Sequence, residues 1–61
     1  MNVEKIKVGR TYPYESRTVP LAEGAKGKVM EIYEGKTGSW VTLFDKERNK
    51  AVTVRPGQVA P

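Results

Sequence analysis

The 61-residue sequence contains no cysteine and no histidine. Without cysteine, the chain has no disulfide to stabilise it and no thiolate for a zinc site or a covalent intermediate. Without histidine, it lacks the usual general base and a common metal ligand near neutral pH. The two serines, Ser16 and Ser39, therefore have no histidine to activate them. We predict a protein that is not an enzyme and that holds no metal or cofactor.

Long apolar runs are also missing. The first ten residues, MNVEKIKVGR, contain no stretch of signal-peptide length, and no later segment is long enough to cross a bilayer. The lack of cysteine is compatible with a reducing compartment. We expect a single domain over residues 1–61, cytoplasmic and without a membrane partner. A domain of this size buries only about 60% of its unfolded surface, so oligomerisation is one way to gain burial.

The charge balance is basic, because 11 lysines and arginines oppose 7 acidic residues and give a net charge of +4. The excess is divided evenly between the two halves of the chain, so there is neither a basic tail nor an acidic block. Such a balance points to DNA or RNA as a partner. Plain solubility explains the same charge, and on charge alone we favour that explanation slightly.

Apolar residues recur at a period of two, which is typical of strands with one buried face. Val41 and Leu43 alternate with Trp40, Thr42 and Phe44. Glycine and proline recur too often for any long helix. The predicted strands cover residues 4–12 (bent at Gly9), 26–34, 39–45 and 50–55, and a short closing strand begins at Val59.

The connections are predicted from turn residues. A long loop runs from Tyr12 to Gly24, and Pro56-Gly57-Gln58 forms a short 3₁₀ turn before the last strand. Asn49 is expected in the left-handed region within the hairpin that follows residue 45. Gly35-Lys36-Thr37 matches the end of a phosphate-binding loop, but Met30 occupies the position where that loop needs glycine. We therefore predict a hairpin turn bracketed by Gly35 and Gly38.

The segment GKVMEIYE breaks strict alternation, because either face would then include a charged residue. A β-bulge near Met30 and Glu31 returns Val29 and Ile32 to the same side and leaves Glu31 in water. Bulged and bent strands are how a five-stranded sheet curls into a small barrel. The sequence thus predicts an all-β fold, a small five-stranded barrel.

The order of these elements resembles that of SH3-like small barrels, and the residues GAKGKVMEI at positions 24–32 resemble the core of a KOW-type motif. This resemblance implies binding to RNA, DNA, or ribosomal or transcription partners. The same barrel occurs in type II dihydrofolate reductases, whose active-site strand carries Val-Gln-Ile-Tyr. The corresponding Val52-Thr53-Val54-Arg55 lacks the Gln and the Tyr. We reject that activity, although the comparison implies that such barrels can oligomerise.

The hypothesis for function uses the face opposite the core. Aromatic rings near cations suit single-stranded nucleic acid, because rings stack on bases and cations meet phosphates. The candidate nucleic-acid-binding residues are Lys28, Trp40, Phe44, Lys50 and Arg55. The competing interpretation buries Trp40 and Phe44 under the long loop, and we favour it for Phe44 and weigh it evenly for Trp40. That core would include Tyr12, Tyr14, Val19 and Leu21. Arg55 would then pair with Glu31 or Asp45.

Two other functions remain open. The loop from Tyr12 to Gly24 lies where SH3-like domains build a peptide groove, so Tyr12, Pro13, Tyr14 and Trp40 are candidates to bind a protein partner. The loop lacks the acidic cluster typical of that family. Alternatively, the chain is a self-assembling structural module without a ligand of its own, and its melting temperature would then depend on concentration.

Overall fold

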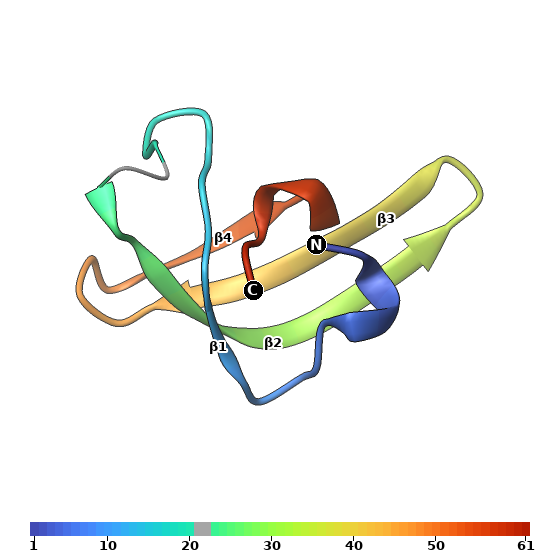
Figure 1. Cartoon of the computed structure of the whole chain (residues 1–61), viewed down its shortest axis with the longest axis horizontal. Helices are drawn as coiled ribbons and strands as arrows, with labels where there is room; N and C mark the ends of the chain where they lie inside the picture. The colour runs from blue at the N-terminus through green and yellow to red at the C-terminus, as the bar shows by residue number, and fades with distance from the viewer. Residues whose placement is uncertain (21–22) are drawn as a thin grey trace.

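The computed structural model describes residues 1–20 and 23–61. Its main feature is one antiparallel sheet with the strand order β1-β2-β3-β4 (Figure 1). The strands are β1 (Thr11–Pro13), β2 (Lys26–Gly35), β3 (Gly38–Asp45) and β4 (Lys50–Val54). Two short 3₁₀ helices, η1 (Val3–Lys5) and η3 (Pro56–Gln58), complete the regular structure. The mostly β composition, the last three strands and the 3₁₀ turn at Pro56 are confirmed.

The described chain has four strands rather than five, and its sheet is not a closed barrel. The expected closing strand is reduced to a single bridge between Tyr14 and Val59. Two backbone bonds flank it, from Glu15 N–H to the Gln58 carbonyl (2.9 Å) and from Ala60 N–H to the Pro13 carbonyl (2.8 Å). Pro56 has no N–H to continue the β4 ladder, and η3 turns the chain away there. The prediction of a closed five-stranded barrel was therefore wrong.

The predicted first strand over residues 4–12 was also wrong. Asn2 accepts a hydrogen bond from Glu4 N–H through its side chain (3.4 Å), and η1 begins at the next residue. A turn follows, in which Gly9 has φ +92°, a conformation that glycine adopts without strain. Ile6 is buried, whereas the side chain of Val8 is 60% exposed. Ile6 therefore directly follows η1 and Val8 lies in the turn, and the first strand covers only Thr11–Pro13.

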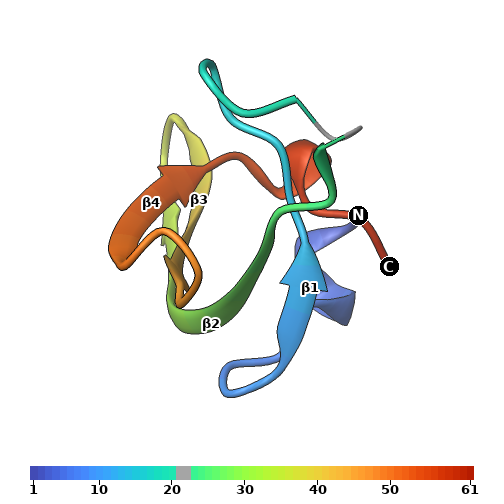
Figure 2. The ribbon, with the colours of Figure 1, turned by 90° about the vertical axis from the view of Figure 1, so that its left-hand side faces the viewer.

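The irregularity in β2 is a β-bulge, as predicted. Val29 lies opposite Leu43 and Glu31 lies opposite Thr42, so Met30 is the additional residue. Ile32 returns to the core side and packs partly buried against the core. In Figure 2, β2 curves from its partner β3 round to β1, as expected for a bulged strand.

Both hairpin turns follow their turn residues. Gly35 pairs with Gly38 across the Lys36-Thr37 turn, and Gly38 has φ +135°. Asn49 has φ +51° in the turn between β3 and β4, which confirms the expected left-handed position.

Gly27, within β2, is required because of a close contact rather than a turn. A Cβ atom there would lie 2.7 Å from Cβ of Leu43, so β2 passes too close to that side chain for a larger residue.

The core lies on the concave side of the sheet. Its buried apolar residues are Ile6, Tyr12, Tyr14, Val19, Ala25, Val29, Val41, Leu43, Val54 and Val59. Two of these, Tyr12 and Tyr14, supply the aromatic volume of the core. Tyr12, Tyr14 and Val19 are therefore core residues, as the buried-aromatic interpretation expected. Leu21, which that interpretation also placed there, lies outside the described residues.

One carboxylate is buried within this core. Asp45 is fully buried, and Tyr14 Oη donates a hydrogen bond to its Oδ2 (2.6 Å). Arg48 donates to Oδ1 from its backbone N–H (3.1 Å) and to Oδ2 from Nη1 (3.2 Å). Arg48 also pairs with Glu23 (3.1 Å). These bonds tie the segments at Tyr14 and Glu23 to the β3–β4 hairpin.

The bonds to Asp45 shift two pKa values. The hydrogen bond from Tyr14 is the main cause that holds the pKa of Asp45 below its usual range, against the opposing effect of burial. Burial first, and then the hydrogen bond to Asp45, raises the pKa of Tyr14 to about 12. The pair therefore consists of a carboxylate and a neutral phenol at neutral pH.

Over residues 1–20 and 23–61, we find no helix with the length and apolar character needed to cross a membrane.

Candidate nucleic-acid interface

The candidate interface lies on the outer face of the sheet, and the alternation of β3 builds it. Val41, Leu43 and Asp45 point into the core and are fully buried. Trp40 and Phe44 have the opposite parity, and neither belongs to the core cluster. The interpretation that buried both rings under the long loop was therefore wrong. Two tyrosines fill the core instead, which leaves both of these rings on the outside.

Phe44 lies in an open hollow of about 460 Å³. Three strands and one turn build this hollow. Its lining residues are Thr11 from β1, Lys26 and Lys28 from β2, Phe44 from β3, and Lys46 and Glu47 from the β3–β4 turn. We call this feature the lysine hollow. Lys28 lies directly opposite Phe44 in the β2–β3 ladder and opposite Thr11 in the β1–β2 ladder, which explains how these three meet.

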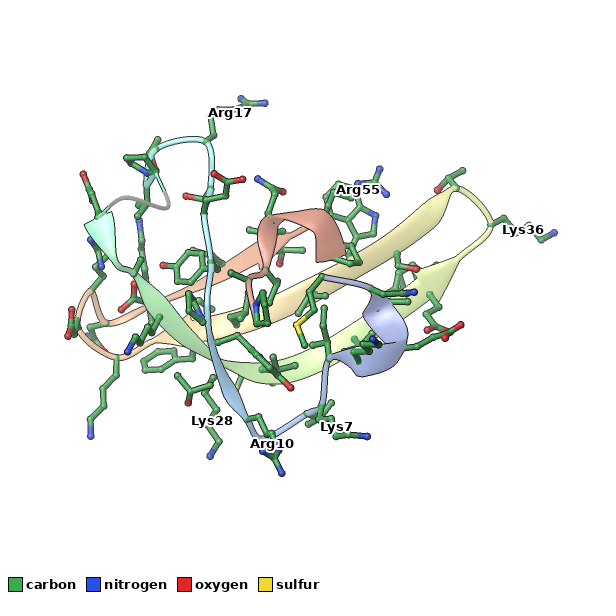
Figure 3. The ribbon with its side chains drawn as sticks, viewed as in Figure 1. Lys7, Arg10, Arg17, Lys28, Lys36 and Arg55 are labelled. Atoms are coloured by element: carbon green, nitrogen blue, oxygen red, sulfur yellow. The ribbon has the colours of Figure 1, made fainter. Side chains whose placement is uncertain are left out.

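Positive charge dominates the lysine hollow. Lys26, Lys28 and Lys46 are exposed, and none of them joins an ion pair among the described residues. Figure 3 shows Lys28 on the same edge of the molecule as Arg10. The ladder supports this placement, because Val29 N–H donates to the Arg10 carbonyl (2.8 Å). Unpaired ammonium groups around an aromatic ring are suited to bind a planar ligand that carries phosphate.

A second aromatic cluster lies four residues earlier on β3. The guanidinium carbon of Arg55 is 3.8 Å from the centre of the Trp40 ring, which is a cation–π contact. Arg55 Nη1 also donates to the Ser39 carbonyl (3.4 Å). Tyr33 lies opposite Trp40 in the ladder, and its side chain is 59% exposed. Arg55 therefore stacks on Trp40, and in the described part of the chain it forms no ion pair with Glu31 or Asp45.

The structure divides the five predicted binding residues into three places. Lys28 and Phe44 line the lysine hollow, whereas Trp40 and Arg55 form the separate stack. In Figure 3, Lys28 and Arg55 project toward opposite edges of the view. Since a strand rises about 3.3 Å per residue, Trp40 and Phe44 are about 13 Å apart along β3.

Lys50 does not join either cluster. It lies opposite Asp45 at the first position of β4. By alternation it is on the same side of the strand as Val52 and Val54, the core side. Lys50 is therefore not among the residues that line the lysine hollow or form the Trp40–Arg55 stack. Ala51 is the β4 residue opposite Phe44.

Four residues of the lysine hollow were not predicted from the sequence. Lys26 was detectable, because it is two positions before Lys28 in the predicted strand and so shares its parity. Lys46 lies in the turn after β3, where strand parity does not locate a side chain. Thr11 and Glu47 carried no such signal. Thr11 joins the hollow only through the β1–β2 register, and Glu47 only through the path of the turn.

The described part of the first loop, residues 12–20 and 23–24, buries two of the rings predicted to line a peptide groove. Tyr12 and Tyr14 are buried, so their rings are not available to line a groove. Tyr14 also uses its hydroxyl to bind Asp45.

Among the described residues, no group of three or more acidic side chains could hold a metal ion.

Comparison of the chain with protein families, with curated proteins and with solved structures found no match.

Proposed function

We propose that this protein is a non-catalytic module that binds single-stranded nucleic acid, RNA or DNA, through its outer sheet face. The observation that carries the proposal is the lysine hollow, in which Lys26, Lys28 and Lys46 surround Phe44. A base stacks on the ring, and the ammonium groups meet the phosphates on either side. Each stacked base contributes about 1–3 kcal/mol to such binding.

The geometry favours a single strand over a duplex. A ring that lies in a hollow reaches the flat face of a base only when that base is unstacked from its neighbours. A duplex offers phosphates to the lysines but no open base face to Phe44. We therefore expect duplex binding to be purely electrostatic and weaker.

The Trp40–Arg55 stack supplies a second contact for a longer strand. Its distance of about 13 Å from Phe44 along β3 exceeds the reach of one base, so a strand must extend over several nucleotides to touch both. An exposed guanidinium plane is itself a stacking surface for a base. Binding should therefore tighten once the oligonucleotide spans both clusters.

The test is a titration with mixed-sequence single-stranded and duplex oligonucleotides at low and moderate salt. We expect single strands to bind more tightly, and affinity to fall as salt rises. Trp40 is the only tryptophan, so its fluorescence reports whether the strand reaches the second cluster. Failure of both nucleic acids to bind at low salt would overturn the proposal.

Two lysines provide a matched pair of variants. Lys28 lines the lysine hollow, whereas Lys36 is at the tip of the β2–β3 hairpin (Figure 3). Lys28→Gln should lower affinity and reduce the slope of log K against log salt by about 0.7, the value for one lost phosphate contact with a single strand. Lys36→Gln should leave both quantities unchanged. Equal effects of the two variants would show that net charge, rather than the hollow, determines binding.

We also propose that the fold is an open relative of SH3-like barrels and of KOW-type modules. The strand order, the 3₁₀ helix after β4 and the bridge from Val59 back to Tyr14 support this relation. The relation agrees with a role in nucleic-acid binding.

Self-association is a second candidate function, and exposed apolar side chains favour it. Val8 and Met30 are 60% and 57% exposed, and Trp40 is partly open as well. Sedimentation and thermal melting over a hundredfold range of concentration test this function. A constant monomer mass and a constant melting temperature would exclude it.

A further inference from the structure

Glu47 is an unexpected residue in a site for phosphates. It lines the lysine hollow together with three lysines. Its carboxylate is exposed, and among the described residues it makes no hydrogen bond or ion pair. A negative charge there weakens the attraction of the hollow for a polyanion. The same carboxylate can accept hydrogen bonds from a ligand that also carries donors.

We infer that the lysine hollow selects guanine within a single strand, with Glu47 as the group that reads the base. This inference rests on the proposed function and names the base that the same site prefers. Guanine stacks on Phe44, Glu47 accepts its N–H groups, and the lysines bind its oxygen and the flanking phosphates.

The donor pattern of the bases explains this choice. Guanine is the base that presents two adjacent donors, N1–H and the N2 amino group, on its Watson–Crick edge. A carboxylate has two oxygens and accepts from both at once. Adenine and cytosine offer one amino group beside an acceptor nitrogen, and thymine and uracil offer one N–H between two carbonyls. The carboxylate repels these neighbouring acceptors.

The other lining groups also fit guanine. Lysine ammonium groups donate to O6 and N7, the acceptors on the edge that adjoins N1–H. The volume of about 460 Å³ lies within the range of small-ligand pockets. Phe44 forms the aromatic surface on which the base stacks, and Lys26 enters from the neighbouring strand β2.

The test uses three five-nucleotide DNA strands: TTGTT, the same strand with inosine in the centre, and TTTTT. Inosine lacks only the N2 amino group, so it isolates that contact. Affinities are measured by fluorescence anisotropy of end-labelled strands at low salt. We expect TTGTT to bind about ten- to hundredfold more tightly than the inosine strand, as one charge-assisted hydrogen bond predicts. TTTTT should bind more weakly still.

Two glutamates supply the protein variants. Glu47→Gln should reduce the preference for guanine over inosine to less than twofold, while affinity for TTTTT rises because a negative charge is lost. Glu34→Gln makes the same charge change at an exposed position of β2 outside the hollow, and should keep the full preference. Circular dichroism confirms that both variants fold.

Each other outcome has a distinct meaning. Equal binding of the three strands by the wild-type protein would overturn guanine selection and leave the proposed function intact. An unchanged preference in Glu47→Gln would overturn the role of Glu47. Binding of guanosine monophosphate as tight as that of TTGTT would assign the hollow to a free nucleotide and overturn the single-strand part. No binding of any strand would overturn the proposed function itself.

Discussion

The two faces of β3 differ in the type of residue that they carry. The core face has the aliphatic side chains of Val41 and Leu43 and one carboxylate, all fully buried. The outer face has the two large rings, Trp40 and Phe44, of which Trp40 is 36% exposed. Hydrophobicity alone would have placed these rings inside. The difference shows that strand parity, together with two tyrosines from elsewhere in the chain, leaves the rings of β3 free for a ligand.

The two acidic residues at the end of β3 and in the turn after it, Asp45 and Glu47, also differ between the core side and the outer side. Asp45 is buried and accepts three hydrogen bonds, so its charge is fully used within the fold. Glu47 is two residues further on and contacts the lysine hollow without a partner among the described residues. A carboxylate on the core side therefore stabilises the structure, and one on the outer side is available for recognition.

The largest effect should come from the core face. Leu43→Ala removes a fully buried side chain and should lower the free energy of unfolding by about 2–5 kcal/mol. A core this small rarely supplies more than about 3–5 kcal/mol, so the variant should be largely unfolded. Urea denaturation followed by circular dichroism measures the loss. Thr42→Ala, on the outer face of the same strand, removes a hydrogen bond with Thr53 (3.2 Å) and should cost only about 0.2–1 kcal/mol. Similar losses in both variants would remove the distinction between the faces.

A smaller effect should follow from Tyr14→Phe. This change removes the hydrogen bond to Asp45 and should cost about 1–3 kcal/mol at neutral pH. Tyr33→Phe is the matched control, because Tyr33 lies on the exposed face and should tolerate the loss of its hydroxyl. Thermal melting of the two variants measures the difference. Equal melting temperatures would show that the buried bond contributes nothing.

Tyr14→Phe should also change how the free energy of unfolding depends on pH. The pKa of Tyr14 is raised from 10.0 to about 12, so its contribution is complete below pH 10 and is lost as the pH rises from 10 to 12. The pKa of Asp45 is lowered from 3.8, so its contribution is present above pH 3.8 and is lost as the pH falls through the lower folded value. Tyr14→Phe should remove the alkaline loss and move the acid transition to higher pH. Parallel pH profiles for the variant and the wild type would contradict this account.

The smallest effect on stability should come from the outer face. Trp40→Leu removes the cation–π contact with Arg55, which is worth about 0.5–1 kcal/mol at an exposed site. A double-mutant cycle with Arg55→Gln should return a coupling energy of that size. The same variant should weaken binding of long oligonucleotides more than that of short ones. A loss of stability comparable to that of Leu43→Ala would place Trp40 in the core.

Local patterns predicted most of the sheet. Alternation gave β2, β3 and β4 to within one residue at each end, and the misplaced charge of Glu31 located the bulge. Closure of the sheet was not predictable in this way, because it depends on pairing between Val59 and Tyr14, far apart in the sequence. The first strand failed because two alternating apolar residues, Ile6 and Val8, are too few to distinguish a strand from a helix and a turn.

The site was predictable only in part, for the same reason. Parity placed Trp40 and Phe44 together on the outer face, but it does not show which residues of other segments lie beside each ring. Lys50 shares the parity of Val52 and Val54, so alternation assigns it to the core side of β4 rather than to the side of the two rings. Glu47 could not be predicted, since a turn residue has no parity with the strand before it.

The bulge at Met30 also determines where this chain tolerates a change in length. Val29 and Glu31 already lie opposite consecutive residues of β3, so loss of Met30 would leave the two faces as they are. Elsewhere in β2, deletion of a single residue would exchange every following side chain between core and solvent. Deletion of Met30 should therefore be tolerated, because it changes the curvature of the sheet and preserves the identity of its two faces.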